Sequence, residues 1–185
     1  MNIRKIIKEE ISNDSIDVLI KSKIQDVSVK YIDFNGDEQT GIIQVNERIV
    51  PNIKKVFNQL HKNGFRINKI EPANGRGDKE LIDNNITTGF NFRRAITPNG
   101  LGKLSKHAWG LSWDINPQVN PAEPNCGMTF DFNCEFGVLN QDDIDMIKSN
   151  GFEWGGEIFK GFYDSHHFEV PFTDEELKIQ NTYKV

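Results

Sequence analysis

The chain has 185 residues and a net charge of −5, with 37% hydrophobic and 26% charged residues. A soluble chain of this size can bury roughly 70% of its unfolded surface around one core, so we predict one folded domain spanning residues 1–185. Its basic residues are interspersed with acidic ones, which argues against a nucleic-acid partner, because binding to phosphates needs clustered Lys and Arg.

The pattern of apolar residues disfavours two further classes of protein, those that span a membrane and those exported by a signal peptide. No apolar run reaches the roughly 18 residues of a membrane span. The first ten residues are interrupted by charges where a signal peptide needs an apolar stretch of about 7–15 residues. We therefore expect no membrane span and no export by the usual secretory route.

The first 70 residues are predicted to hold an N-terminal helix, a β-hairpin and a core helix. Apolar residues alternate within Gln25–Phe34, Asn35-Gly36 opens a turn of two residues or more, and Gly41–Val45 supplies the second strand. The core helix follows from Ile49, and Asn63-Gly64 gives it a C-terminal stop. Its apolar residues at helical spacing are Ile53, Val56, Phe57 and Leu60.

Residues 71–185 begin with a stretch rich in Gly, Asn, Thr and Asp that extends to about Gly102. We expect long loops with short ordered pieces there, and such loops are often functional. Asn140 caps a predicted short helix that ends near Gly151, and Thr173 with Glu176 forms a predicted capping box for a last helix. Cys126 and Cys134 are expected to be free thiols.

Three of the four histidines fall in two polar clusters, which are Ser105–Asp114 and Asp164–Glu169. A fully extended chain would place His107 and Asp114 roughly 23 Å apart, too far to share an ion. A bend is required before the strand that carries Asp114, and Gly110 is the residue that permits it.

Strand alternation separates the two histidines of the second cluster. His167 and Glu169 share one face, whereas His166 lies with the apolar residues of the other, so His167 is the better ligand. Together with His107 and Asp114 it makes a three-ligand set that suits zinc and leaves a fourth position open for catalysis. Asp164, three residues before His167, is the candidate general base. The alternative is that these are solvated polar residues on strands.

Several motifs together carry a family resemblance. They are Thr87-x-x-Phe90-Asn-x-Arg93, Ser105-x-His107-x-x-Gly110-x-x-x-Asp114-Ile-Asn-Pro, Gly151-Phe-x-Trp154-Gly-Gly and Asp164-x-x-His167-Phe-Glu169. In this order they resemble the D-alanyl-D-alanine carboxypeptidase and L-alanyl-D-glutamate endopeptidase family of zinc peptidases. The resemblance covers roughly Thr87 to Glu169.

The resemblance implies a small α+β domain with a central antiparallel sheet flanked by helices, in which residues 71–185 are the catalytic region. It also implies zinc bound by His107, Asp114 and His167, and proton transfer by Asp164. Arg93 corresponds to an arginine near the substrate, where it would bind a peptide carboxylate or stabilise the oxyanion. A surface arginine or an ion pair is the alternative.

Three further residues are candidates for substrate binding. Asn91 lies within the upstream motif, and Ser105 either bonds the substrate or caps a turn. Trp154 either forms a pocket wall or packs in the core. His166 is predicted to be a neighbour of the site and not a ligand.

The function implied is hydrolysis of a peptide bond in the peptidoglycan stem peptide, either L-alanyl-D-glutamate internally or a terminal D-alanine. The protein would act as a monomer, remain cytoplasmic until released, and reach the cell wall as a phage endolysin or by an unconventional export route. The alternatives are a D,D-dipeptidase acting on soluble dipeptides and a zinc-binding or peptide-binding module without catalysis. The loop from Asn120 to Cys134 departs from the family pattern, which leaves the substrate open.

Overall fold

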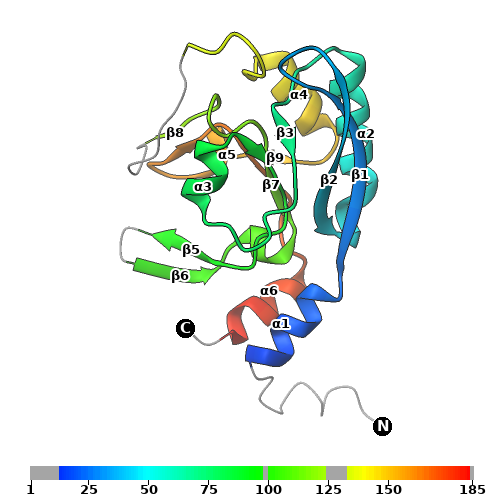
Figure 1. Ribbon diagram of the computed structural model, residues 1–185. Helices are drawn as coiled ribbons and strands as arrows, with labels where there is room; N and C mark the ends of the chain where they lie inside the picture. The colour runs from blue at the N-terminus through cyan, green and yellow to red at the C-terminus, as the bar shows by residue number, and fades with distance from the viewer. Residues whose placement is uncertain (1–12, 98–99, 124–132, 184–185) are drawn as a thin grey trace.

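The computed structural model describes residues 13–97, 100–123 and 133–183 (Figure 1). Its helices, with 3-10 helices written as η, are α1 (Asn13–Lys21), η2 (Glu47–Ile49), α2 (Val50–Lys62), α3 (Asp78–Asp83), η3 (Lys106–Trp109), α4 (Gln141–Ser149), α5 (Gly155–Ile158) and α6 (Asp174–Thr182). Its strands are β1 (Ile24–Ile32), β2 (Glu38–Asn46), β3 (Lys69–Ile70), β4 (Ile86–Thr87), β5 (Arg94–Thr97), β6 (Gly100–Leu104), β7 (Ser112–Asp114), β8 (Ala122–Glu123), β9 (Glu153–Trp154), β10 (Tyr163–Asp164) and β11 (His167–Glu169). The α+β class is confirmed.

The predicted hairpin is formed by β1 and β2, which pair antiparallel from Ile24 opposite Asn46 to Ile32 opposite Glu38. This register leaves residues 33–37 in the turn, so the turn is longer than two residues. The Asp33 carboxylate accepts hydrogen bonds from the backbone N–H groups of Asn35 and Asp37, and these bonds hold the turn. The buried hydrophobic side chains of the hairpin are Val27, Val29, Tyr31, Ile43 and Val45.

The core helix α2 lies along this hairpin, as Figure 1 shows. Pro51 stands in its first turn, where a missing N–H costs nothing, and the chain leaves the helix through Asn63 and Gly64, whose φ is +74°. All four predicted apolar positions are buried, which confirms the helical spacing read from the sequence. The helix therefore covers one face of the hairpin and presents Phe57 to the centre of the molecule.

The β-structure is divided among small sheets, and this is where the expected central sheet fits only loosely. The sheet with three strands has the order β7-β11-β9 and is antiparallel; the hairpin forms another sheet, and β3 pairs with β4 in parallel. The ends of β7 explain its short length. Gly110 before it has φ +62° and Asn116 after it has φ +42°, and this left-handed conformation does not continue a strand.

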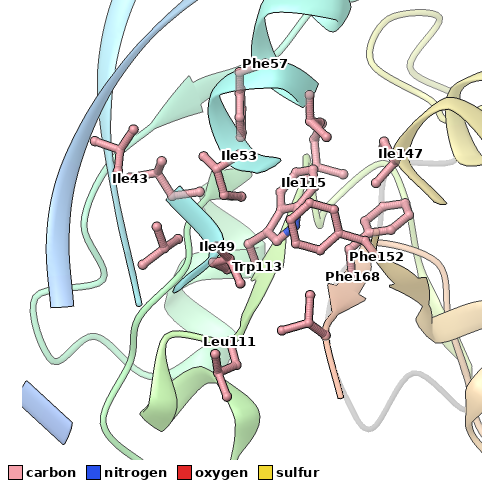
Figure 2. Close-up of a cluster of buried hydrophobic side chains, with 14 of the residues drawn as sticks. Ile43, Ile49, Ile53, Phe57, Leu111, Trp113, Ile115, Ile147, Phe152 and Phe168 are labelled. Carbon is pink, nitrogen blue, oxygen red and sulfur yellow. The ribbon is translucent and has the colours of Figure 1, made fainter. Parts of the chain in front are cut away.

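Trp113 anchors the back of the three-stranded sheet (Figure 2). Its fully buried ring stacks on Phe168 with centroids 5.2 Å apart, and it also contacts Phe57 at 5.2 Å and Phe152 at 5.7 Å. These rings come from β7, β11, α2 and the segment before β9. The packing holds β7 and β11 against the core. Because successive side chains of a strand point to opposite faces, the neighbours of Trp113 and Phe168 on these strands face away from the core.

The two predicted capping boxes are both present. The Asn140 side chain accepts from the Asp143 N–H at the start of α4, and Thr173 accepts from the Glu176 N–H at the start of α6. α6 is tied to the middle of the chain because the Trp109 indole N–H donates to the side-chain oxygen of Gln180 at 2.9 Å. In Figure 1, α1 and α6 lie next to each other at the end opposite α4.

Two remaining expectations concern the membrane and the cysteines. Within the described ranges, every helix is too short or too polar to span a bilayer. Cys134 is a free thiol, and Cys126 lies outside the described residues.

Candidate metal centre

The first half of the site is the turn η3, which carries His107. The Ser105 hydroxyl accepts a hydrogen bond from the His107 N–H at 3.2 Å and thereby caps this turn. Gly110 ends it in the left-handed conformation, and a Cβ there would stand 2.7 Å from the backbone N of Asn46. The bend expected at Gly110 is thus present, and a close approach to the hairpin also requires a glycine at this position.

The second half is the pairing of β7 with β11. Their antiparallel register places His167 opposite Asp114 and Phe168 opposite Trp113. Directly opposite residues project from the same face of a sheet, so the core packing of Trp113 and Phe168 turns Asp114 and His167 to the other face. The fold in this way gathers two histidines and an aspartate that lie up to 60 positions apart in sequence.

Three donor atoms meet at this face. His107 Nε2 lies 3.2 Å from His167 Nδ1 and 3.2 Å from an Asp114 carboxylate oxygen, and His167 Nδ1 lies 3.0 Å from the other oxygen of Asp114. Tetrahedral zinc ligands stand about 3.4 Å from one another when metal–ligand distances are about 2.1 Å. The two imidazoles are almost fully buried and the carboxylate is half-buried. The residues fit a metal ion in both donor type and spacing.

The outer nitrogen of each imidazole has a partner of its own. His107 Nδ1 lies 2.8 Å from the Gly89 carbonyl oxygen and donates to it, and His167 Nε2 lies 3.1 Å from a carboxylate oxygen of Glu169. These contacts place the protons on the outer nitrogens. With a metal ion bound, the inner nitrogens, His107 Nε2 and His167 Nδ1, would be left to direct their lone pairs at the ion, which is the usual arrangement of imidazoles around a metal.

The pKa values of these groups follow from burial and from each other. Burial would raise the pKa of Asp114, but the charge of His107 and hydrogen bonds with both histidines hold it well below its usual value. Burial lowers the pKa of His167, and hydrogen bonds with Asp114 and Glu169 outweigh this effect and raise the pKa to about 10. Burial alone would raise the pKa of Glu169, but its interactions with His167 and Lys106 outweigh burial and bring the pKa below its usual value. Asp114 and Glu169 are therefore anions at neutral pH.

Asp164 lies beside the three donors and is not one of them. It ends β10, and its carboxylate oxygen is 3.0 Å from Nε2 of His166. Its charge contributes to the raised pKa of His167, and the Cβ atoms of both residues lie beside Gly155. His166 Nδ1 donates to the Asn120 carbonyl at 2.7 Å, which directs this ring away from the donor cluster.

Gly155 allows Asp164 and His167 to come together. A Cβ on Gly155 would stand 2.5 Å from the Asp164 carbonyl oxygen, 2.9 Å from His167 Cβ and 3.2 Å from Asp164 Cβ. The sequence motif included this glycine, but its reason is visible only in three dimensions. No side chain fits between the first helix turn of α5 and the strand that carries the site.

Gly155→Ala is expected to lower the free energy of unfolding by about 1–3 kcal/mol, the usual cost of overpacking, and to weaken metal binding by displacing His167. Chemical denaturation together with a zinc titration measures both effects. Gly77→Ala is the control, because a Cβ on Gly77 meets no atom within 4 Å. Unchanged zinc binding in Gly155→Ala would show that the close approach is unimportant for the site.

Two residues of the upstream motif, Arg93 and Asn91, connect segments around the site. The Arg93 guanidinium Nε lies 2.6 Å from a carboxylate oxygen of Asp78, so Arg93 takes part in an ion pair, which was one of its two expected roles. The Asn91 N–H donates to the His107 carbonyl at 3.1 Å, and its side-chain amide donates to the Arg76 carbonyl at 3.0 Å. Asn91 thus connects the loop that carries Arg76 with the turn that carries His107.

Ser105 and Trp154 also have framework contacts. Ser105 caps η3, which is one of the two roles considered for it. Trp154 is buried, its indole N–H donates to the Ser165 carbonyl at 3.0 Å, and its ring meets that of Tyr163 edge to face. Trp154 packs in the hydrophobic core, on β9 opposite Phe168 of β11.

Four contributors to the site were missed by sequence reasoning. They are the Gly89 carbonyl, the carboxylate of Glu169, the Lys106 ammonium that lies 3.4 Å from this carboxylate, and the Phe159 ring, whose centroid is 5.5 Å from that of His167. Glu169 could have been found from its alternation with His167. The backbone carbonyl and the aromatic ring gave no sequence signal.

Two buried imidazoles and a carboxylate, with a second carboxylate beside them, define the class of candidate metal-dependent hydrolases. The family model described as D-alanyl-D-alanine carboxypeptidase matches residues 99–170. This match confirms the family resemblance carried by the motifs: the region that holds the three donors and Asp164 is similar to this peptidase family. Searches of curated proteins and of solved structures gave no match.

Proposed function

We propose that this protein is a zinc-dependent peptidase that hydrolyses a peptide bond in the stem peptide of bacterial peptidoglycan. The observation that carries the proposal is the meeting of His107, Asp114 and His167 at donor spacing with Asp164 beside them. The family match supports the substrate class, since peptides ending in D-alanine occur in this polymer. When bound, zinc supplies a Lewis acid that acidifies a water molecule and polarises the peptide carbonyl.

Asp164 is the proposed general base of this reaction. Its side chain is 16% exposed, and one of its carboxylate oxygens lies 3.0 Å from Nε2 of His166. An ionised carboxylate in this position accepts a proton from the attacking water and returns it to the leaving amine. A pure metal-binding module has no use for such a group, which favours catalysis over binding alone.

Arg93 is the proposed contact for a substrate carboxylate or for the oxyanion. Its Nε pairs with the Asp78 carboxylate, and the planar fork of a guanidinium suits a substrate carboxylate. We propose that Ser105, Asn91 and Trp154 serve substrate binding by shaping the site, because their polar groups already bond the surrounding backbone. Since one chain supplies all three metal donors, we also propose that the monomer is active.

Purified protein is expected to contain about one zinc ion per chain, to lose activity on chelation and to regain it when zinc is added. Elemental analysis gives the zinc content, and mass spectrometry of fragments released from defined peptidoglycan gives the bond. New amino termini at D-glutamate identify an endopeptidase, and free D-alanine identifies a carboxypeptidase.

Two results contradict the proposal or redirect it. Full activity in metal-free protein would exclude the metal mechanism, and zinc binding without any released fragment would favour the non-catalytic module. Cleavage of soluble D-alanyl-D-alanine with no action on peptidoglycan would identify a dipeptidase. For a wall-degrading enzyme we expect the turbidity of purified cell walls to fall.

A further inference from the structure

A second carboxylate stands on the outer side of His167. While Nδ1 of this ring lies 3.0 Å from Asp114, Nε2 lies 3.1 Å from an oxygen of Glu169. The imidazole is therefore held between two acids, one on the side of the metal donors and one behind it. Neither the proposed metal set nor proton transfer uses Glu169.

Glu169 is itself held by Lys106. The Lys106 ammonium lies 3.4 Å from the other oxygen of Glu169, donates to the Val170 carbonyl at 2.5 Å and sits 4.2 Å from the centre of the Phe172 ring. The side chains of Lys106 and Glu169 are only 15% and 12% exposed. A carboxylate this far from water is costly without a partner, so the ammonium stabilises its ionised form and limits its motion.

Lys106 and Glu169 lie close to the two imidazoles of the site in the sequence. Lys106 directly precedes His107 in η3, and Glu169 follows His167 by two residues on the same face of β11. The contact between Lys106 and Glu169 therefore joins the two elements that carry the imidazoles. A change in this contact would alter the distance between the donors and the tilt of the His167 ring.

We propose that Glu169 and Lys106 are positioning residues that hold His167 with its proton on Nε2 and its Nδ1 lone pair toward the metal ion. The inference rests on the proposed metal site, and it adds residues that do not themselves touch the ion. Glu169 orients the ring through one hydrogen bond, and Lys106 acts one step further out by orienting Glu169. Partners of this kind raise metal affinity because the ligand needs no reorientation on binding.

The test compares four variants by zinc titration against a competing chelator. Glu169→Leu removes the acceptor and is expected to weaken zinc binding by about 10- to 100-fold, the usual effect of losing such a partner. Glu169→Gln keeps an oxygen that accepts from Nε2, so much of the affinity should return. Lys106→Met keeps the apolar stem over Phe172 and should give an intermediate loss.

Arg48→Met is the matched control. Arg48 also donates to a backbone carbonyl, that of Pro171 at 2.9 Å, and pairs with a buried carboxylate, that of Glu176 at 3.1 Å, but it contacts no residue of the donor cluster. Replacing Arg48 breaks an ion pair similar to that of Lys106 with Glu169, and it should leave zinc affinity unchanged. A loss of zinc in all variants, the control included, would mean that only general stability is involved and would overturn the proposal.

Nitrogen NMR of His167 supplies a signal that would stay unchanged if Glu169 contributed only to the stability of the fold. Zinc-loaded wild-type protein should show a protonated Nε2 with one set of signals, and Glu169→Leu should broaden or divide them. Equal zinc affinity and equal spectra in wild type, Glu169→Leu and Lys106→Met would overturn the positioning role while leaving the zinc peptidase intact. A wild-type protein that binds no zinc would overturn both.

Discussion

His167→Ala is expected to lose both bound zinc and peptidase activity. The substitution removes one of three donor atoms that lie within 4.8 Å of one another, and two remaining protein ligands do not complete a catalytic zinc set. It also leaves Asp114 and Glu169 without their common partner, so two half-buried carboxylates face each other across an empty space. Elemental analysis after dialysis and kcat on a defined stem peptide measure the two losses.

His166→Ala separates a ligand from its neighbour. His166 bonds the Asn120 carbonyl and approaches Asp164, but the donor cluster does not include it. We expect this variant to keep its zinc and to retain part of its activity, with the loss confined to kcat through Asp164. Zinc lost in His166→Ala and kept in His167→Ala would show that the wrong histidine has been chosen.

The elements that could be predicted from sequence are those whose signals are local. Period-two alternation gave the hairpin, apolar spacing gave α2, and capping residues gave the starts of α4 and α6, because each pattern reports on one face of one element. The bend at Gly110 followed from a distance argument alone, since an extended chain cannot bring His107 to Asp114. The choice of His167 over His166 used the same alternation, which the register of β11 reproduces.

What could not be predicted depends on contacts between distant segments. The end of β7 is set by the left-handed conformation of Asn116, and although asparagine favours that conformation, the residue type alone does not say which asparagine adopts it. The Gly89 carbonyl carries no side-chain signal, although it orients His107. The pairing of Lys106 with Glu169 joins positions 63 residues apart (169 − 106), and only the packing of η3 beside β11 reveals it.

Asp164→Asn is expected to keep zinc bound while kcat falls by about 10²- to 10⁴-fold, the usual contribution of general acid–base catalysis. Asparagine has nearly the same shape and cannot accept the proton from water. The contacts around Asp164 should survive the change, because the Gly155 approach involves the backbone and Cβ of residue 164. Zinc content and kcat measured on the same peptide test this expectation.

Asp114→Asn supplies the contrast, since it makes the same substitution, an NH2 group in place of one oxygen, at the carboxylate among the three donors. Asp114 contacts both imidazoles, at 3.2 Å to His107 and 3.0 Å to His167, and its pKa is held well below the usual value, so it meets the metal as an anion. A neutral amide at this position binds zinc more weakly, and affinity should therefore fall together with activity. If Asp164→Asn loses zinc while Asp114→Asn retains it, the ligand and the base have been assigned the wrong way round.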